Sequence, residues 1–116
     1  MVENFKLWLE GLLEDDPVPE EIDILLFNIK SNGEYKFIEL IGYENQINSN
    51  AITYYPLESQ FYWNHALAKQ DNKTFIFEVK YIIEEAFASL ILKTQLKNKK
   101  IYLKCNNEIN YLFKVE

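Results

Sequence analysis

Apolar residues near the start of the chain recur at the spacing of one helical face. Phe5, Trp8, Leu9 and Leu12 follow the i, i+3, i+4, i+7 pattern, and Asn4 precedes them as a capping residue. Two prolines soon afterwards end this pattern, because proline lacks a backbone N–H and disfavours helical geometry in the residue before it. The pattern predicts a short N-terminal helix.

Two apolar segments then indicate a β-hairpin. Residues 22–30 (IDILLFNIK) and 34–43 (EYKFIELIGY) are rich in branched and aromatic side chains and are separated by a Ser-Asn-Gly turn sequence. Their near-continuous apolar runs are typical of central strands that are covered on one face and partly covered on the other. Gly42, inside the second segment, is expected to mark a bulge.

The middle of the chain has weaker patterns. After a polar stretch, residues 52–55 and 60–64 are expected to form short strands, with Pro56 between them. The sequence FYWNHALA, residues 61–68, fits a strand edge and the start of a helix about equally well. The secondary structure there stays open at this point.

A longer amphipathic pattern predicts a second helix from about residue 74 to residue 96, capped by Asp71 or Asn72. This helix is expected to pack across the sheet. Its apolar stripe consists of Phe75, Val79, Ile82, Ile83, Ala86, Phe87 and Leu90.

The end of the chain predicts a second hairpin. Residues 101–105 and 108–115 flank two asparagines, which tolerate the positive φ angles of a type I′ turn. Apolar residues at every second position from Ile109 to Val115 predict a strand with one buried face. Cys105 is expected to be a small buried group and not a nucleophile.

These elements predict an α+β fold. The expected arrangement is a mainly antiparallel sheet of about four to six strands, with one long helix packed on a face and a short N-terminal helix. The 116 residues suit a single domain, 1–116.

Composition argues against several classes of function. Cys105 and His65 are the only cysteine and the only histidine, so no intrachain disulfide or cysteine-caged zinc is expected. Three glycines are too few for a phosphate-binding loop. The chain lacks arginine and has a net charge of -6, which disfavours binding to nucleic-acid backbones. We therefore expect no enzyme activity, no cofactor, no metal and no nucleic-acid partner.

The sequence also predicts a cellular location. The chain starts Met-Val-Glu-Asn, with an acid where a signal peptide needs positive charge. No apolar run approaches the roughly 18 residues that a membrane-spanning helix needs. We expect a cytoplasmic protein without a membrane partner.

Negative charge is concentrated in the first half of the chain. Residues 1–58 hold 12 acids and 3 lysines, whereas residues 59–116 hold 6 acids and 9 lysines. Six of the acids are close together: Glu14, Asp15, Asp16, Glu20, Glu21 and Asp23. Such a run is either a solvated connection or a surface that attracts a cationic partner. On the scale of the whole chain, the two halves either interleave their charges or leave one face of the molecule acidic.

Aromatic residues are concentrated between positions 54 and 63. Alternate members either fill the core or form a partly exposed binding surface, since Tyr and Trp are enriched in binding hot spots. Our leading hypothesis is a non-enzymatic protein-interaction domain that binds a basic protein partner. The contact residues it predicts are the six acids together with Tyr54, Tyr55, Tyr62 and Trp63.

Glu39 interrupts an otherwise apolar strand. Its carboxylate should be paired, protonated, or directed to an open face of the sheet, and the open face is what we expect. If it is instead buried near Tyr54, Trp63 and His65, these four residues would line a ligand pocket between the second helix and the sheet. A small-ligand-binding domain is therefore the alternative hypothesis. A structural homodimer, formed through an uncovered sheet face or edge, is the third.

The segment IDILLFNIKSNGEYKFIELIGYEN, followed by an aromatic loop and an apolar helix, resembles a group of small uncharacterised bacterial α+β proteins. The stretch IELIG, Ile38 to Gly42, carries most of the resemblance, which extends loosely from Val18 to Leu92. Members usually have a more acidic, tryptophan-bearing segment where this chain has INSNAITYY. Some small acidic proteins of this kind resemble immunity proteins of bacterial toxin systems, which implies toxin neutralisation with a basic toxin domain as the partner.

Overall fold

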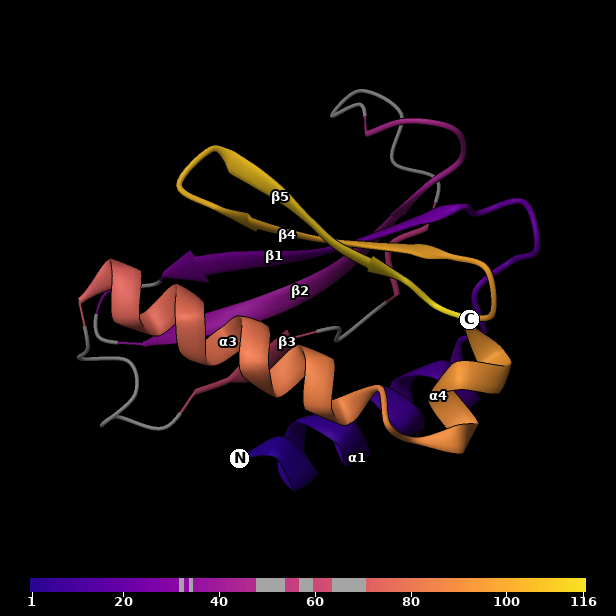
Figure 1. The fold of residues 1–116 in the computed structure, drawn as a ribbon, viewed down its shortest axis with the longest axis horizontal. Helices are drawn as coiled ribbons and strands as arrows, with labels where there is room; N and C mark the ends of the chain where they lie inside the picture. Colours follow the sequence, from indigo (N-terminus) through magenta and orange to yellow (C-terminus); the bar gives the residue numbers. More distant parts are fainter. Residues whose placement is uncertain (32, 34, 48–53, 57–59, 64–70) are drawn as a thin grey trace.

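The N-terminal helix begins at the second residue of the chain in this computed structural model. Helix α1, Val2–Asp15, buries Phe5, Leu9 and Leu13 (Figure 1). It therefore starts before the capping position expected at Asn4 and is longer than predicted. The structure describes residues 1–31, 33, 35–47, 54–56, 60–63 and 71–116.

The strands form one five-stranded sheet in the order β3-β2-β1-β4-β5. Strand β1 pairs antiparallel with β2 and parallel with β4, and the two outer pairings are antiparallel. The bounds are β1 Ile24–Ser31, β2 Lys36–Tyr43, β3 Gln60–Tyr62, β4 Lys100–Cys105 and β5 Glu108–Lys114. The mainly antiparallel α+β sheet is thus confirmed, with β1 and β2 among its three inner strands. Of the strand expected at 52–55, Tyr54 forms an isolated bridge to Gly42, and residues 52 and 53 lie outside the described part.

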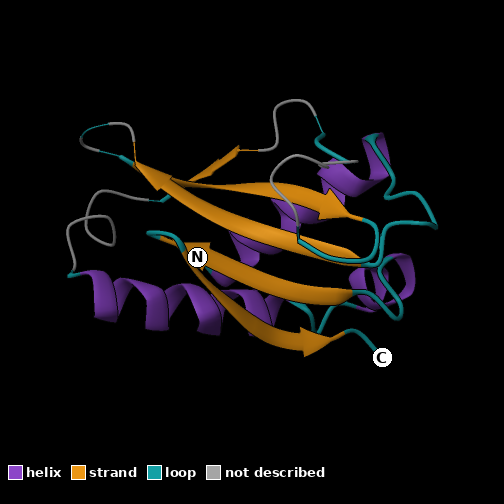
Figure 2. Ribbon diagram, turned by 90° about the horizontal axis from the view of Figure 1, so that it is seen from above, coloured by secondary structure: helices purple, strands orange, loops and turns teal. Residues whose placement is uncertain are grey.

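All three described helices cover the same face of the sheet (Figure 1), and Figure 2 looks onto the opposite, helix-free face. Helix α3, Asn72–Ala86, begins after Asp71, whose carboxylate accepts a hydrogen bond from the backbone N–H of Thr74. This hydrogen bond, together with one from the Thr74 hydroxyl, lowers the pKa of Asp71. Asp71, and not Asn72, is therefore the cap.

The predicted second helix is broken into two. Helix α4, Leu90–Gln95, starts anew because the Ser89 side chain accepts a hydrogen bond from the N–H of Leu92 and caps it. The break turns Leu90 outward, where it is 77% exposed, although the helical stripe predicted it in the core. The other six members of that stripe are buried as predicted.

The main core lies between the helices and the sheet. Phe5 is at its centre, with its ring 5.7 Å from the ring of Phe27 and 5.5 Å from that of Phe61. A smaller apolar cluster, on the helix-free face, consists of Ile24, Leu26, Ile41 and Tyr43, with Ile47 and Tyr102 packed against it. Both faces of the inner strands are therefore covered at this end of the sheet.

Gly42 does not mark a bulge, since the register from β1 to β2 continues through it. A Cβ atom at Gly42 would lie 2.8 Å from Cβ of Tyr54 and 2.9 Å from Cγ2 of Ile22. The glycine is needed because these two side chains pack directly on its backbone.

The described register contains a bulge in the second hairpin instead. Ile101 faces Phe113 while Tyr102 faces Tyr111, so Leu112 is an extra residue in β5. The bulge reverses the alternation along β5. Ile109 and Tyr111 are consequently exposed on the helix-free face, which corrects the prediction that they share one buried face with Val115. The Asn-Asn turn itself is confirmed, with φ angles of 52° and 70°.

Candidate partner-binding surfaces

The six clustered acids lie on the connection between α1 and β1. We call residues 14–23 the acidic segment, which is at the same end of the molecule as α4 (Figure 1). All six acidic side chains are exposed, and none forms an ion pair with a described residue. Their charges are therefore directed to solvent without a counterion from the described part of the chain.

Two side chains from distant parts of the chain hold the backbone of this segment. The Tyr54 hydroxyl donates a hydrogen bond of 2.6 Å to the carbonyl oxygen of Asp16. The ammonium group of Lys99, which is 8% exposed, donates to the carbonyl oxygens of Pro19 and Ile22. The carbonyl groups of Asp16, Pro19 and Ile22 thus point inward, whereas the six acidic side chains are exposed.

The C-terminal end of the acidic segment is joined to the sheet. The N–H of Asp23 donates to the carbonyl of Tyr43 at 3.1 Å, and the N–H of Lys100 donates to the carbonyl of Asp23 at 2.9 Å. This pairing brings Lys100 alongside Asp23 in the backbone, yet their side chains form no ion pair. The positive half of the chain therefore supports the segment through its backbone and one buried lysine, without neutralising its carboxylates.

Tyr54 connects the segment to the core, and replacing it with phenylalanine should cost about 1 kcal/mol of unfolding free energy. Burial, and then the charge of Asp16, raise the pKa of the Tyr54 hydroxyl. A raised folded-state pKa gives stability that is full below the ordinary tyrosine pKa of about 10 and is lost as pH rises above it. Urea denaturation at pH 7 and pH 10.5 should therefore show a smaller penalty for Tyr54→Phe at the higher pH. An equal penalty at both values would contradict this role.

The structure separates the clustered aromatic residues into two groups. Tyr54 and Trp63 are buried in the main core, and Phe61 packs against it. Tyr55 and Tyr62 are exposed. Tyr62 pairs with Phe37, at the end of β2 farthest from the acidic segment. The predicted contact residues therefore do not form one continuous surface. Tyr54 and Trp63 are packed in the core, and Tyr62 lies at the end of the sheet away from the acidic segment.

Glu39 is on the helix-free face, as expected from the strand pattern, but it is buried at 2% exposure. The ammonium group of Lys30 lies 2.9 Å from its Oε1 atom, and the hydroxyl of Tyr55 donates a hydrogen bond to Oε2. Its charge is thus compensated within the protein. The arrangement fixes Tyr55 across the sheet and leaves Glu39 inaccessible to a ligand.

The four residues of the predicted ligand pocket do not converge. Tyr54 and Trp63 are on the helix-covered side of the sheet, whereas Glu39 is on the opposite side. Strand alternation explains the separation, because Glu39 lies between Ile38 and Leu40, which both point into the main core. His65 lies outside the described residues.

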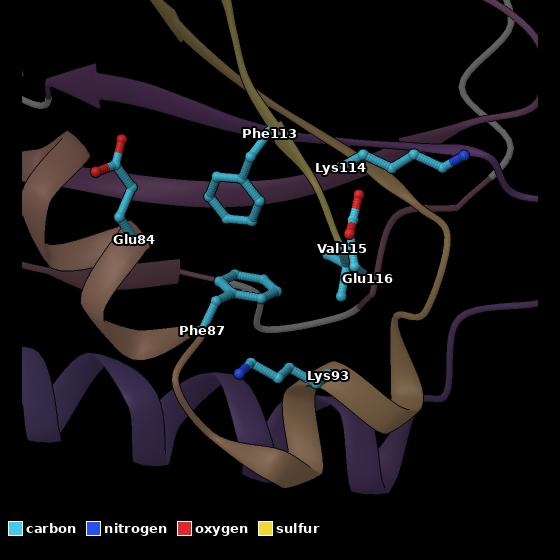
Figure 3. A pocket seen from close by; sticks show the side chains of 7 residues that line it. All are labelled: Glu84, Phe87, Lys93, Phe113, Lys114, Val115 and Glu116. Atoms are coloured by element: carbon cyan, nitrogen blue, oxygen red, sulfur yellow. The ribbon is translucent and has the colours of Figure 1, made fainter.

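A groove of about 290 Å³ was not predicted from the sequence. Phe87 and Phe113 line it and lie next to each other (Figure 3), with ring centroids 5.2 Å apart in an edge-to-face contact. Glu84, Lys93 and Glu116 also line the groove, as does Lys114, whose side chain extends away from the two rings (Figure 3). Phe113 lies on the helix side of the sheet, where strict alternation also placed it, and the bulge at Leu112 moves only Ile109 and Tyr111 to the opposite face.

Cys105 is buried, and burial raises the pKa of its thiol. Glu108 raises it further, whereas Lys36 lowers it. The thiol is therefore kept protonated, which agrees with its expected role as a packing group. In the described part of the chain, no three His, Cys, Asp or Glu side chains come together as they would around a metal ion.

Comparisons with protein-family models, with curated proteins and with solved structures find no match to this chain. None of the described helices is long and apolar enough to cross a membrane. The proposal below depends on the geometry of the acidic segment.

Proposed function

We propose that this chain is a non-enzymatic protein-interaction domain that binds a basic protein partner through its acidic segment. One observation carries the proposal. Six exposed carboxylates, without ion-pair partners among the described residues, project from a backbone that Tyr54 and Lys99 hold from the inside.

This arrangement has two physical consequences. Clustered like charges create a negative potential that speeds the approach of a cationic surface, and the effect weakens as salt is added. A backbone that is already fixed loses little conformational entropy on binding, so more of the interaction energy appears as affinity. Both consequences favour a docking surface over a merely solubilising loop.

The aromatic contribution is smaller than the sequence suggested. Tyr54 supports the segment from inside and Trp63 packs in the core, so neither is available to a partner. Tyr55 and Tyr62 are exposed but lie on the helix-free face. The contact surface that we propose is therefore the six acids alone.

The chain resembles small uncharacterised bacterial α+β proteins, and the likeness of some small acidic proteins of this kind to immunity proteins suggests a specific form of this function. In that form the partner is a basic toxin domain, and the acidic segment covers a cationic surface that the toxin needs for its activity. Exposed, fixed carboxylates are suited to this task because they complement a lysine- or arginine-rich site. The ligand-binding alternative is not carried forward, since the residues it needs are on opposite faces of the sheet.

Charge neutralisation tests the proposal. The test variant combines Glu14→Gln, Asp15→Asn, Glu20→Gln and Glu21→Gln, and each protein is immobilised to capture partners from an extract of the source cells. We expect the wild-type chain to retain a basic protein whose purified form binds at least about tenfold more weakly to the variant. The measured affinity should also fall as ionic strength rises.

A matched control separates position from total charge. Glu44, Glu84, Glu85 and Glu108 are exposed acids outside the segment, and changing all four to Gln removes the same charge. This control should bind like the wild type. Equal losses in both variants, or affinity that does not change with salt, would contradict the proposal.

A further inference from the structure

The helix-free side of β4 and β5 has a surface of lysine, tyrosine and isoleucine side chains, in contrast to the acidic segment. Register places Lys100 opposite Lys114, Tyr102 opposite Tyr111, and Lys104 opposite Ile109. We call these six residues the basic-aromatic face. Because Glu108 pairs with the buried Cys105, it is on the other side of the hairpin, and none of the six residues is acidic.

The aromatic part of this face is accessible. Tyr111 is 54% exposed and Ile109 is 42% exposed, and the Tyr102 and Tyr111 rings lie 5.3 Å apart in an edge-to-face arrangement. None of its three lysines forms an ion pair with a described residue. Strand β5 is also an edge strand, so a ligand can approach it from the side.

The charge of this face restricts what can bind to it. A second copy of the chain packed face to face would bring lysines against lysines, and a basic protein would be repelled in the same way. The homodimer hypothesis therefore gains no support from this surface. The complementary partner is anionic.

The spacing of the side chains favours one kind of anion. Lys100 and Lys104 each lie two residues from Tyr102, which is about 7 Å along a strand. Lysines on either side of an exposed Tyr111 ring and a half-buried Tyr102 ring match a chain of phosphates and bases, because bases of any sequence stack on aromatic side chains. An acidic peptide offers the charge but not the stacking groups.

We propose that the basic-aromatic face binds single-stranded nucleic acid, with a base stacked on the exposed ring of Tyr111, which the Tyr102 ring supports, and phosphates paired with the lysines. Lysine contacts to phosphates and base stacking on tyrosine do not distinguish one base from another, so the binding is independent of base sequence. The net charge of -6 opposes binding only over short distances, since the screening length is about 8 Å in physiological salt. This inference revises the expectation drawn from total charge, and it does not depend on the proposed function.

Fluorescence anisotropy with a labelled 12-nucleotide oligouridylate, starting at physiological ionic strength, tests the inference. We expect binding that weakens as salt is added, and Tyr111→Ala should lower the affinity about fivefold or more. Lys104→Gln should also weaken binding, and it provides a second variant that leaves the aromatic pair intact. Tyr81→Ala is the matched control, because Tyr81 is 52% exposed on α3 and should have no effect.

A polyglutamate peptide of equal charge distinguishes the two anionic partners. Weaker binding of polyglutamate than of oligouridylate supports the inference. Equal or tighter binding of polyglutamate would overturn it in favour of an acidic polypeptide. Absence of oligouridylate binding, or equal affinities for wild type and Tyr111→Ala, would overturn it as well.

Discussion

Replacing Phe5 with alanine is expected to lower the free energy of unfolding by about 3–5 kcal/mol. Phe5 is fully buried, and its ring contacts those of Trp8, Phe27, Phe61 and Trp63. Its removal would leave a cavity where α1 meets the sheet. A domain of this size has a total free energy of unfolding of only about 5–15 kcal/mol, so the variant should be close to unfolding.

Urea denaturation followed by far-ultraviolet circular dichroism measures this effect. Leu7→Ala is the matched control, because Leu7 is on the same helix but is exposed. The control should change stability by less than about 0.5 kcal/mol. Similar losses for the two variants would mean that α1 is not packed through Phe5.

Replacing Lys99 with methionine should have the second-largest effect, a loss of about 2–3 kcal/mol. Methionine keeps the apolar length of the side chain but cannot donate to the carbonyls of Pro19 and Ile22. These carbonyls would lose their ammonium partner, and the acidic segment would lose one of its supports. Chemical denaturation gives the loss of stability, and amide hydrogen exchange reports on the segment itself.

The exchange experiment distinguishes local from global destabilisation. Faster exchange in the variant should appear at residues 20–24 before it appears in β2, because the Lys99 contacts hold only that connection. Lys97→Met serves as a control, since Lys97 is exposed and makes no such contact. A uniform increase across the sheet, or no change in stability, would contradict the supporting role of Lys99.

Local sequence signals predicted most of the fold. The hairpin of β1 and β2 follows from two apolar segments joined by a short turn sequence, and the second hairpin from its two asparagines. The face of α3 follows from helical spacing, with Phe75, Val79 and Ile83 buried. These features depend on residues close together in the chain, where periodicity and turn chemistry are informative.

Most of these errors have tertiary causes, although the cap that Ser89 provides to α4 is a local contact that the helical pattern overlooked. Ser89 interrupts a continuous helical pattern, and its hydroxyl also donates to Glu10 of α1 at 2.6 Å, a contact across 79 residues. The bulge at Leu112 depends on the pairing of β5 with β4. Gly42 is explained by Tyr54, which packs on it from another segment. None of these contacts is visible in a local pattern.

The sequence predicted the acids of the candidate site but not the side chains that support them. The run of acids was identified because charged residues in a proline-containing connection are usually exposed. Its supports were missed, since Tyr54 and Lys99 are 38 and 80 residues from the carbonyls of Asp16 and Pro19. Whether Tyr54 and Trp63 face a partner or the core also depended on how the sheet pairs, which composition does not specify.

A nuclear magnetic resonance titration tests the central claim most directly. The labelled chain is titrated with a lysine-rich peptide, and chemical-shift changes are followed at each backbone amide. We expect the largest changes at residues 14–23, and these changes should shrink as salt is added, while the amides of α3 barely respond. Changes spread evenly over the surface, or concentrated away from the acidic segment, would contradict it.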